Sequence, residues 1–314
     1  SMSAHAMPAK PGKQKLTLRR AVDDGFTYLA LTVVSLIFLL PCLWLILASL
    51  SKSGSLYEIH GFFPTEYSLQ TFIDLFTDDV NGLYPYRQWF INTLYVASMS
   101  CVFGTVLVIL TGYVMSRFRF KGRNAVKNLT LVLGMFPGFM GMTAIYIIMA
   151  QLGLLNRLEA LICLYAGTAP MGYLVQKGYF DTIPATIHEA ARIDGCNDFQ
   201  IVWRIIFPLS GPVLAILALY YALGHWNGYF NALMYIEDRN LQPLQIFLRE
   251  ILVLNQKIDM NADIEELEAM VARVQMAQTM KYSLIVVASV PMLIIYPFVQ
   301  KFFVKGVMIG SVKG

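Results

Sequence analysis

Long apolar runs, separated by shorter polar stretches, dominate the chain. A helix needs roughly 17–25 residues to cross a bilayer. Six apolar runs are long enough, and they cover residues 27–50, 90–115, 129–150, 160–176, 208–236 and 282–304. Because lipid offers the backbone no hydrogen-bond partners, such runs form helices. The pattern predicts an all-α, polytopic integral membrane protein with six transmembrane helices. The first run lies too far from the start for a signal peptide, so we expect it to remain as an anchor.

The composition supports this class. Of the 314 residues, 57% are hydrophobic and 14% are charged, whereas soluble domains carry about 25% charged residues. A soluble globular protein is therefore excluded. The segments outside these runs include a basic tail over residues 1–26, a loop over 177–207 and a long loop over 237–280.

Lys and Arg are distributed unevenly between the two sides that six crossings would create. The side of the two termini carries 16 of them and the opposite side carries 7, with Lys281 at a boundary. Positive residues concentrate on the cytoplasmic side of membrane proteins. We therefore predict that both termini and the 177–207 loop are cytoplasmic and that the 237–280 loop is external. The net charge of +4 reflects this bias and gives no indication of nucleic-acid binding.

The cytoplasmic loop 177–207 is a charged interruption between two apolar runs. Thr186 and Glu189 have the spacing of a capping box, which predicts a helix that starts near Ile187. Gly195 is expected to break this helix, and a second short helix would run to Phe207, with Pro208 opening the fifth span. The small Ala190 and Ala191 would let another protein approach closely. An amphipathic helix lying on the lipid headgroups is the alternative.

Sequence signatures of catalysis are missing. There is no Walker A glycine loop, no His-Glu-x-x-His zinc helix and no Gly-x-Ser-x-Gly elbow. The four His residues lack metal-ligand spacing and the four Cys residues lack paired spacing. We predict no catalytic residue, no cofactor, no metal site and no disulfide. Carboxylates are also scarce inside the spans, which indicates that the energy for any transport comes from another chain.

Two external features leave alternatives open. The helix expected within 262–280 either packs on its own protein or meets an external partner. The end of the fifth span carries Trp226, Asn227, Tyr229 and Asn231. Aromatic rings stack on sugar rings and Asn side chains match hydroxyl groups, so these residues are candidates for a substrate path. An aromatic belt at the external membrane interface would explain the same residues.

The fixed spacing in the cytoplasmic loop resembles a known family. Glu189-Ala190-Ala191, three residues, Gly195, nine residues and Ile-Ile-Phe-Pro208 is similar to the EAA loop of membrane subunits of binding-protein-dependent ABC importers. Three further stretches resemble the MalG-type carbohydrate importers: Trp89–Thr93, Ser116–Gly122 and Trp226–Gly228. The ending Gln300–Gly314 is similar to the LplC-like oligosaccharide sub-branch.

This resemblance implies a permease subunit in a bacterial cell membrane rather than an enzyme. Its partners would be a second homologous permease, two cytoplasmic ATPase subunits and an extracytoplasmic sugar-binding protein. The ATPase-coupling residues would be Glu189, Ala190, Ala191, Asp194, Gly195 and Pro208. Among these, Glu189 would take a basic ATPase partner and Gly195 would set the angle between the coupling helices. An importer for a non-sugar solute and a membrane-embedded polysaccharide-processing protein are the alternatives.

Overall fold

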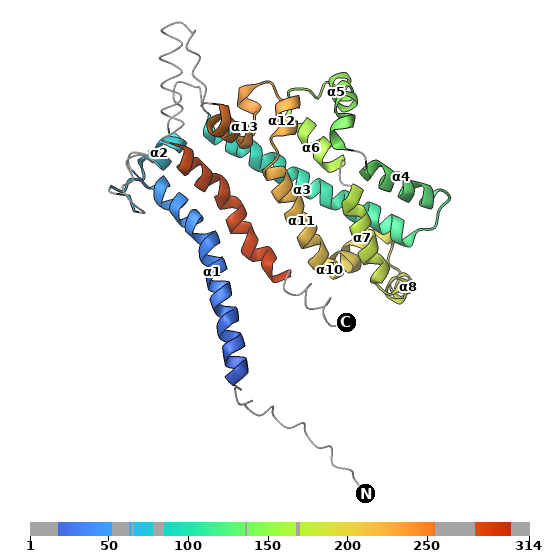
Figure 1. Ribbon diagram of the computed structural model, residues 1–314. Helices are drawn as coiled ribbons and strands as arrows, with labels where there is room; N and C mark the ends of the chain where they lie inside the picture. Colours follow the sequence, from blue (N-terminus) through green and yellow to red (C-terminus); the bar gives the residue numbers. More distant parts are fainter. Residues whose placement is uncertain are drawn as a thin grey trace.

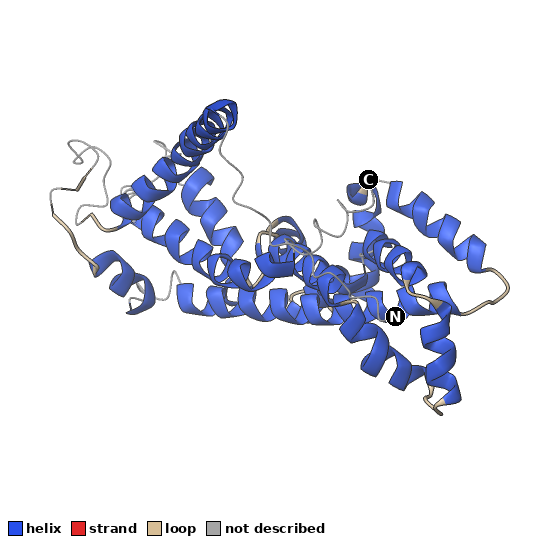
Figure 2. Cartoon of the chain, turned by 90° about the horizontal axis from the view of Figure 1, so that it is seen from below, coloured by secondary structure: helices blue, strands red, loops and turns tan. Residues whose placement is uncertain are grey.

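The computed structural model describes residues 18–51, 63–64, 66–77, 85–135, 137–167, 170–254 and 280–302. Within these ranges the chain consists of helices and loops, and its only β pairing is an isolated bridge between Ser51 and Tyr67 (Figure 2). The prediction of an all-α protein is confirmed for this part of the chain. The external helix expected within 262–280 lies outside it, except for Met280.

The helices follow the apolar runs, with ends that differ from the predicted spans. The α-helices are α1 (Leu18–Ser49), α2 (Gln70–Thr77), α3 (Tyr86–Arg117), α4 (Arg123–Met135), α5 (Met142–Gln151), α6 (Leu158–Gly167), α7 (Pro170–Thr182), α8 (Ala185–Ile193), α9 (Asp198–Ile201), α10 (Phe207–Leu209), α11 (Gly211–Trp226), α12 (Phe230–Tyr235) and α13 (Leu244–Arg249). Short 3-10 or π segments are η3 (Gly138–Gly141), η4 (Val202–Ile206), η5 (Arg239–Leu241) and η6 (Glu250–Leu254). A final helix runs over Met280–Phe302.

Three described helices are long and apolar enough to cross a membrane alone: Asp23–Ser49, Tyr86–Arg117 and Met280–Phe302. Three bent pairs pass the same test only when both members are taken together. The bends are 100° between α4 and the segment Gly138–Gln151, 45° between α6 and Gly172–Thr182, and 84° between Asp198–Leu209 and α11. The described helices therefore provide between three and six crossings.

Helix α3 is the central element of the bundle and packs against α6, α7 and α11 (Figure 1). It contributes to three separate apolar clusters. Trp89 lies in the first with Phe247 and Leu284, and Val96 lies in the second with Leu161 and Tyr235. The third cluster contains Ile109 and Tyr113, together with residues of α8, α9 and η4.

Helix α1 differs from α3 because almost none of its apolar surface is covered. No residue of its most apolar stretch is buried, and Figure 1 shows it apart from the bundle over most of its length, meeting the other helices near α2. A surface of this size is unfavourable in water and suits lipid or a second membrane chain. At its end, the Ser283 hydroxyl lies within hydrogen-bond distance of the Ser49 carbonyl (3.2 Å) and of Thr71 Oγ1 (2.8 Å).

The start of α3 holds the loop that leads into α13. Trp89 Nε1 donates to the Arg239 carbonyl (2.5 Å), and Asn92 Nδ2 donates to the Asn240 carbonyl (2.7 Å). Thr93 Oγ1 accepts a hydrogen bond from the Leu244 amide (2.7 Å). These buried bonds give a structural reason for the stretch Trp89–Thr93 and fix where α13 begins.

Candidate functional site

The predicted break at Gly195 is confirmed and has a defined geometry. Helix α8 ends at Ile193, and Gly195 has φ = +81°, a left-handed conformation that favours glycine. Its amide donates to the Arg192 carbonyl (3.0 Å), while the Cys196 amide donates to the Ala191 carbonyl (3.0 Å). This pair of bonds is a Schellman motif, which satisfies the last carbonyls of a helix. The chain therefore turns sharply between two helical arms. The first arm is α8, and the second begins at Asp198 and ends at Leu209.

The predicted capping box at Thr186 and Glu189 is wrong. Helix α8 begins at Ala185 with Pro184 as its N-cap and makes no side-chain cap bond. The fixed φ of proline places the helix start earlier, so Thr186 lies inside the first turn and Glu189 lies beyond it. A capping box occurs instead at the second arm, where Asn197 Oδ1 accepts from the Gln200 amide (2.8 Å) and Gln200 Oε1 accepts from the Asn197 amide (3.0 Å).

Pro208 does not open the fifth span, contrary to the prediction. The second arm continues through α9, the π segment η4 and α10 to Leu209, and α11 begins at Gly211 after an 84° bend. Pro208 lacks an amide hydrogen and so makes no backbone bond to the preceding turn, while Pro212 lies in the first turn of α11, where proline is tolerated. The buried Ser210 hydroxyl instead donates to the Ile206 carbonyl (2.7 Å). The predicted span 208–236 is also interrupted, since α11 ends at Trp226 and α12 follows.

The two arms are anchored by their inner face. Ala191 is only 5% exposed and lies in the cluster that contains Tyr113, Phe180 and Ile206. Its small side chain therefore allows α8 to pack on its own chain, rather than admitting another protein as predicted. Ala190, on the next position, is exposed.

The outer face of the arms combines acidic and apolar side chains. Glu189, Asp194, Gly195 and Pro208 are exposed, and Glu189 forms no salt bridge within the described part of the chain. Ile193 is 85% exposed and Phe199 is 68% exposed. Sequence reasoning missed both residues, although each is a large apolar residue beside the glycine turn. Together they form an apolar surface that flanks the turn.

Tyr113 of α3 connects the two arms. Its hydroxyl donates to Asp198 Oδ1 (3.2 Å) and lies 3.3 Å from His188 Nδ1. Asp198 also accepts from Arg192 Nη2 (2.8 Å) across the turn. Partial burial, and next the Arg192 charge, lower the pKa of His188, while the hydrogen bond from Arg192 is the main cause that lowers the pKa of Asp198. A neutral imidazole and an ionised carboxylate thus face the same tyrosine at neutral pH.

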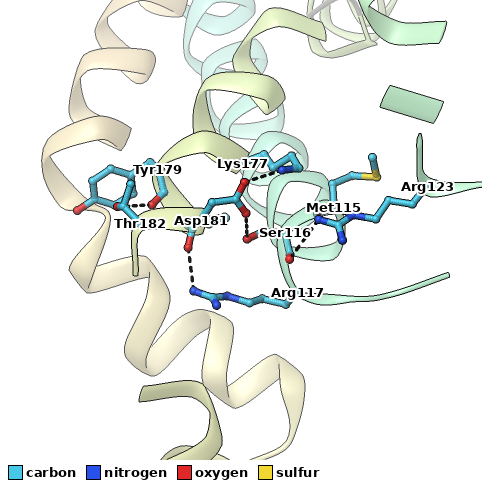
Figure 3. A network of polar contacts seen from close by, with 9 residues as sticks. Met115, Ser116, Arg117, Arg123, Lys177, Tyr179, Asp181 and Thr182 are labelled. Carbon is cyan, nitrogen blue, oxygen red and sulfur yellow. Dashed lines mark hydrogen bonds and ion pairs between the residues drawn. The ribbon is translucent and has the colours of Figure 1, made fainter. Parts of the chain in front are cut away.

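A second polar network fixes the end of α3 to α7 (Figure 3). Arg117 Nη2 donates to the Phe180 carbonyl (2.8 Å) and the Ile183 carbonyl (2.7 Å), which are near the end of α7. Asp181 accepts hydrogen bonds from Ser116 (2.7 Å) and Lys177 (2.5 Å). Lys177 was predicted to begin the cytoplasmic loop, but it lies within α7, which continues to Thr182.

At the opposite end of α11, three of the four candidate substrate-path residues line one cavity of about 690 Å³. These are Trp226, Asn227 and Tyr229; the cavity lies between the end of α11, helix α13 and the helix Met280–Phe302. Trp226 is 2% exposed, and its Nε1 donates to the Ala288 carbonyl (3.0 Å). The indole is therefore held in the bundle and does not form part of an exposed aromatic belt.

Asn231 does not line this cavity. Within the described residues, no group of three or more His, Cys, Asp and Glu side chains is placed to hold a metal ion. The polar cavity residues that the prediction omitted include Gln245 and Arg249 of α13. Both belong to the loop 237–280, whose fold could not be read from its sequence.

Comparison with known proteins identifies the type of chain. Protein LplC of Bacillus subtilis (strain 168) is 35% identical over 298 residues, which cover 93% of this chain and 95% of that protein. The polygalacturonan/rhamnogalacturonan transport system permease protein YtcP of the same organism is 33% identical, with 95% and 100% covered. The maltodextrin transport system permease protein MalD of Streptococcus pneumoniae (strain ATCC BAA-255 / R6) is 29% identical, with 95% and 99% covered.

A solved structure has the same fold. It is the crystal structure of a bacterial ABC transporter involved in the import of the acidic polysaccharide alginate, and one of its chains matches with a TM-score of 0.76 and 25% identity. The match covers 93% of this chain and 100% of that chain. These relatives are transport subunits, so the alternative of a polysaccharide-processing enzyme is excluded. Residues 104–309 match the family described as binding-protein-dependent transport system inner membrane component, and the chain belongs to this family.

Proposed function

We propose that this chain is a MalG-type permease subunit of a bacterial importer for oligosaccharides. It pairs with a second homologous permease chain, and the pair binds two cytoplasmic ATPase subunits. An extracytoplasmic binding protein delivers the sugar. ATP hydrolysis on the ATPase subunits drives alternating access of the membrane bundle.

The surface on the two arms is the observation that carries this proposal. Ile193 and Phe199 expose large apolar side chains, and Glu189 forms no salt bridge with any residue that the structure describes. The inner face of the arms is held in the core. Burying one such side chain against a partner contributes about 1.5–3 kcal/mol. Glu189 lies too far along α8 to cap it, so a basic ATPase residue explains its presence better than helix stability does.

A movement of the arms can be passed to the membrane helices through side-chain contacts. Tyr113 contacts both arms, and Arg117 on the same helix holds the end of α7. A displacement of the arms by ATPase closure would therefore move α3 and α7 together. Gly195 sets the angle between the two arms. Asp194, Ala190 and Pro208 lie on the exposed side of the arms.

In this proposal two of the bent pairs each form one crossing, and α11 alone forms the crossing of the third pair, because Asp198–Leu209 stays in the cytoplasm. With the three long helices this gives six crossings and both termini in the cytoplasm. The excess of Lys and Arg on one side supports this orientation. So does the position of α8 and α10 at the opposite end of the bundle from α12 and α13 (Figure 1). A cysteine at Asn197 should react only with a cytoplasmic reagent, and one at Asn240 only with an external reagent. Labelling of both from one face would contradict the six-crossing topology.

The names of the relatives support the substrate class. They include transport permeases for polygalacturonan/rhamnogalacturonan, maltodextrin and galactooligosaccharides. The cavity that contains Trp226 and Tyr229 supplies aromatic faces of the kind that stack on sugar rings. A non-sugar solute is the second candidate, because the apolar walls of this cavity would also accept other organic molecules.

Purification and reconstitution test the proposal. The tagged chain, expressed with its neighbouring genes, should retain one copy of a second permease and two ATPase subunits per chain. Proteoliposomes should then take up oligosaccharides when ATP and the loaded binding protein are present. Uptake of amino acids or ions but of no sugar in a solute panel would favour the second candidate. Purification without any ATPase would refute the coupling role of the arms.

A further inference from the structure

We propose that Arg249 makes the cavity beside Trp226 a binding site for saccharides that carry a carboxylate group. The inference rests on the proposed function, because it takes the substrate to be a carbohydrate. It adds a substrate class, an oligosaccharide of uronic acids, and a residue that recognises the charge. Arg249 is the last residue of α13 and lines the cavity together with Tyr229 and Gln245.

Among the residues that the structure describes, no acidic side chain pairs with Arg249. Its guanidinium carbon lies 5.5 Å from the centre of the Tyr229 ring. The nearby Arg239 provides a contrast. It pairs with Glu250 (3.4 Å) and lies 5.4 Å from the centre of the Trp89 ring. Unlike Arg239, Arg249 can therefore donate hydrogen bonds to the carboxylate of a ligand that enters the cavity.

The surroundings of Arg249 suit a charged sugar. A guanidinium binds a carboxylate through two parallel hydrogen bonds, and Tyr229 restricts its orientation from one side. Trp226 is fixed by its bond to Ala288. Asn227 Nδ2 donates to the Leu223 carbonyl (2.9 Å), so the amide oxygen of Asn227 remains available to accept a sugar hydroxyl.

The size and walls of the cavity agree with this assignment. Its volume of about 690 Å³ falls within the roughly 300–1,000 Å³ of small-molecule sites. The remaining walls are mostly apolar and include Leu248, Ile285 and Met292. Such walls lower the local dielectric constant and strengthen the attraction between the guanidinium and a carboxylate. A neutral sugar would leave the arginine unpaired, so the site discriminates by charge.

The test compares trigalacturonate with its methyl ester, in which each carboxylate is replaced by an uncharged ester group. Binding of both probes is measured to the whole permease–ATPase complex in phosphatidylcholine nanodiscs. The wild-type complex should bind trigalacturonate about tenfold more tightly than the ester, the ratio expected from one charged hydrogen-bonded pair. Added salt should weaken binding of trigalacturonate and leave binding of the ester unchanged.

Variants assign this preference to one residue. Arg249→Gln should remove the preference and leave ester binding unchanged, whereas Arg249→Lys should keep part of it. Arg87→Gln, which changes an exposed arginine at the start of α3, should behave as the wild type. If the Arg249→Gln complex fails to assemble, two measurements still test the inference. They are the salt dependence of trigalacturonate binding to the wild type and the preference of Arg249→Lys for trigalacturonate over the ester.

Each other outcome overturns the inference. Equal binding of the two probes to the wild type, or an unchanged preference in Arg249→Gln, would show that Arg249 does not select for charge. An effect of Arg249→Gln that appears only in nanodiscs with anionic phosphatidylglycerol would assign the residue to a lipid headgroup. Uptake of neutral oligosaccharides with no binding of trigalacturonate would refute this inference and leave the proposed function intact. Absence of any sugar uptake would refute the proposed function itself.

Discussion

Substitution of Gly195 separates backbone strain from crowding at the turn between the two arms. The residue has φ = +81°, and a Cβ atom built there would meet no heavy atom within 4 Å. A new side chain therefore costs free energy through the backbone conformation and not through a clash inside the chain. Asn, Ala and Val at this position form a graded series, because Asn tolerates the left-handed region and a β-branched residue does so least.

The magnitude follows from the conformation. A residue other than glycine in the left-handed region costs roughly 1–2 kcal/mol, which changes the population of the native turn by about 5- to 30-fold. The two hydrogen bonds of the turn, to the Arg192 and Ala191 carbonyls, contribute about 0.5–1.5 kcal/mol each. They are lost together if the turn opens. We expect little effect for Gly195→Asn, about a tenfold loss of ATPase affinity for Gly195→Ala, and a larger loss for Gly195→Val.

The assay measures the affinity of the purified permease pair for the ATPase, together with sugar uptake per ATP hydrolysed. The thermal stability of the permease pair alone is the control. It should fall by no more than the backbone strain of roughly 1–2 kcal/mol, because a Cβ atom at this position meets no heavy atom within 4 Å. Equal ATPase affinity across the series would refute the role of the turn geometry. A loss for Asn as large as that for Val would show that the partner rejects any side chain at this site, so that contact rather than strain decides.

Three further substitutions test other contacts. Glu189→Lys should weaken ATPase binding by more than the ~0–1 kcal/mol of a surface pair, because it places like charges together; Glu189→Gln should weaken it less, and equal binding of both variants would contradict the ion pair. Tyr113→Phe removes the hydroxyl that joins the two arms and should lower uptake per ATP while ATPase binding persists; an unchanged ratio would contradict this. Asn156→Ala should lower the stability of the permease pair by about 1–3 kcal/mol, measured as a lower midpoint of thermal unfolding, because the Asn156 side chain accepts two loop amides at 3.1 and 2.7 Å; an unchanged midpoint would contradict it.

The sequence was informative about the turn and misleading about the helix start. Gly195 could be predicted to break α8 because glycine at the end of a helix has a local conformational cause. The Thr186 cap failed although its spacing was correct. A capping residue must be extended, and Pro184, two residues earlier, takes that role with φ = −55° and ψ = 135°. Spacing alone cannot tell which of two neighbouring residues ends the extended segment.

The cavity shows the same limit over longer distances. Trp226, Asn227 and Tyr229 could be selected because they follow one another in an aromatic and polar stretch. Arg249 could not, since its approach to Tyr229 depends on how the loop after α12 folds back. That fold depends on hydrogen bonds to Trp89, Asn92 and Thr93, about 150 residues away in the sequence. Such contacts leave no periodic pattern.

Helix α3 therefore serves both candidate sites. At one end, Trp89 and Thr93 hold the backbone that leads into α13 and so help to place Arg249 beside the cavity. At the other end, Tyr113 and Arg117 bind the two arms and α7. The helix is unbroken over 32 residues, whereas three other candidate crossings are bent. Because a packed helix moves as a rigid body, a tilt of α3 caused at the arms would also shift the walls of the cavity. The long straight helix thus provides a direct physical connection between ATPase binding and the site proposed for the sugar.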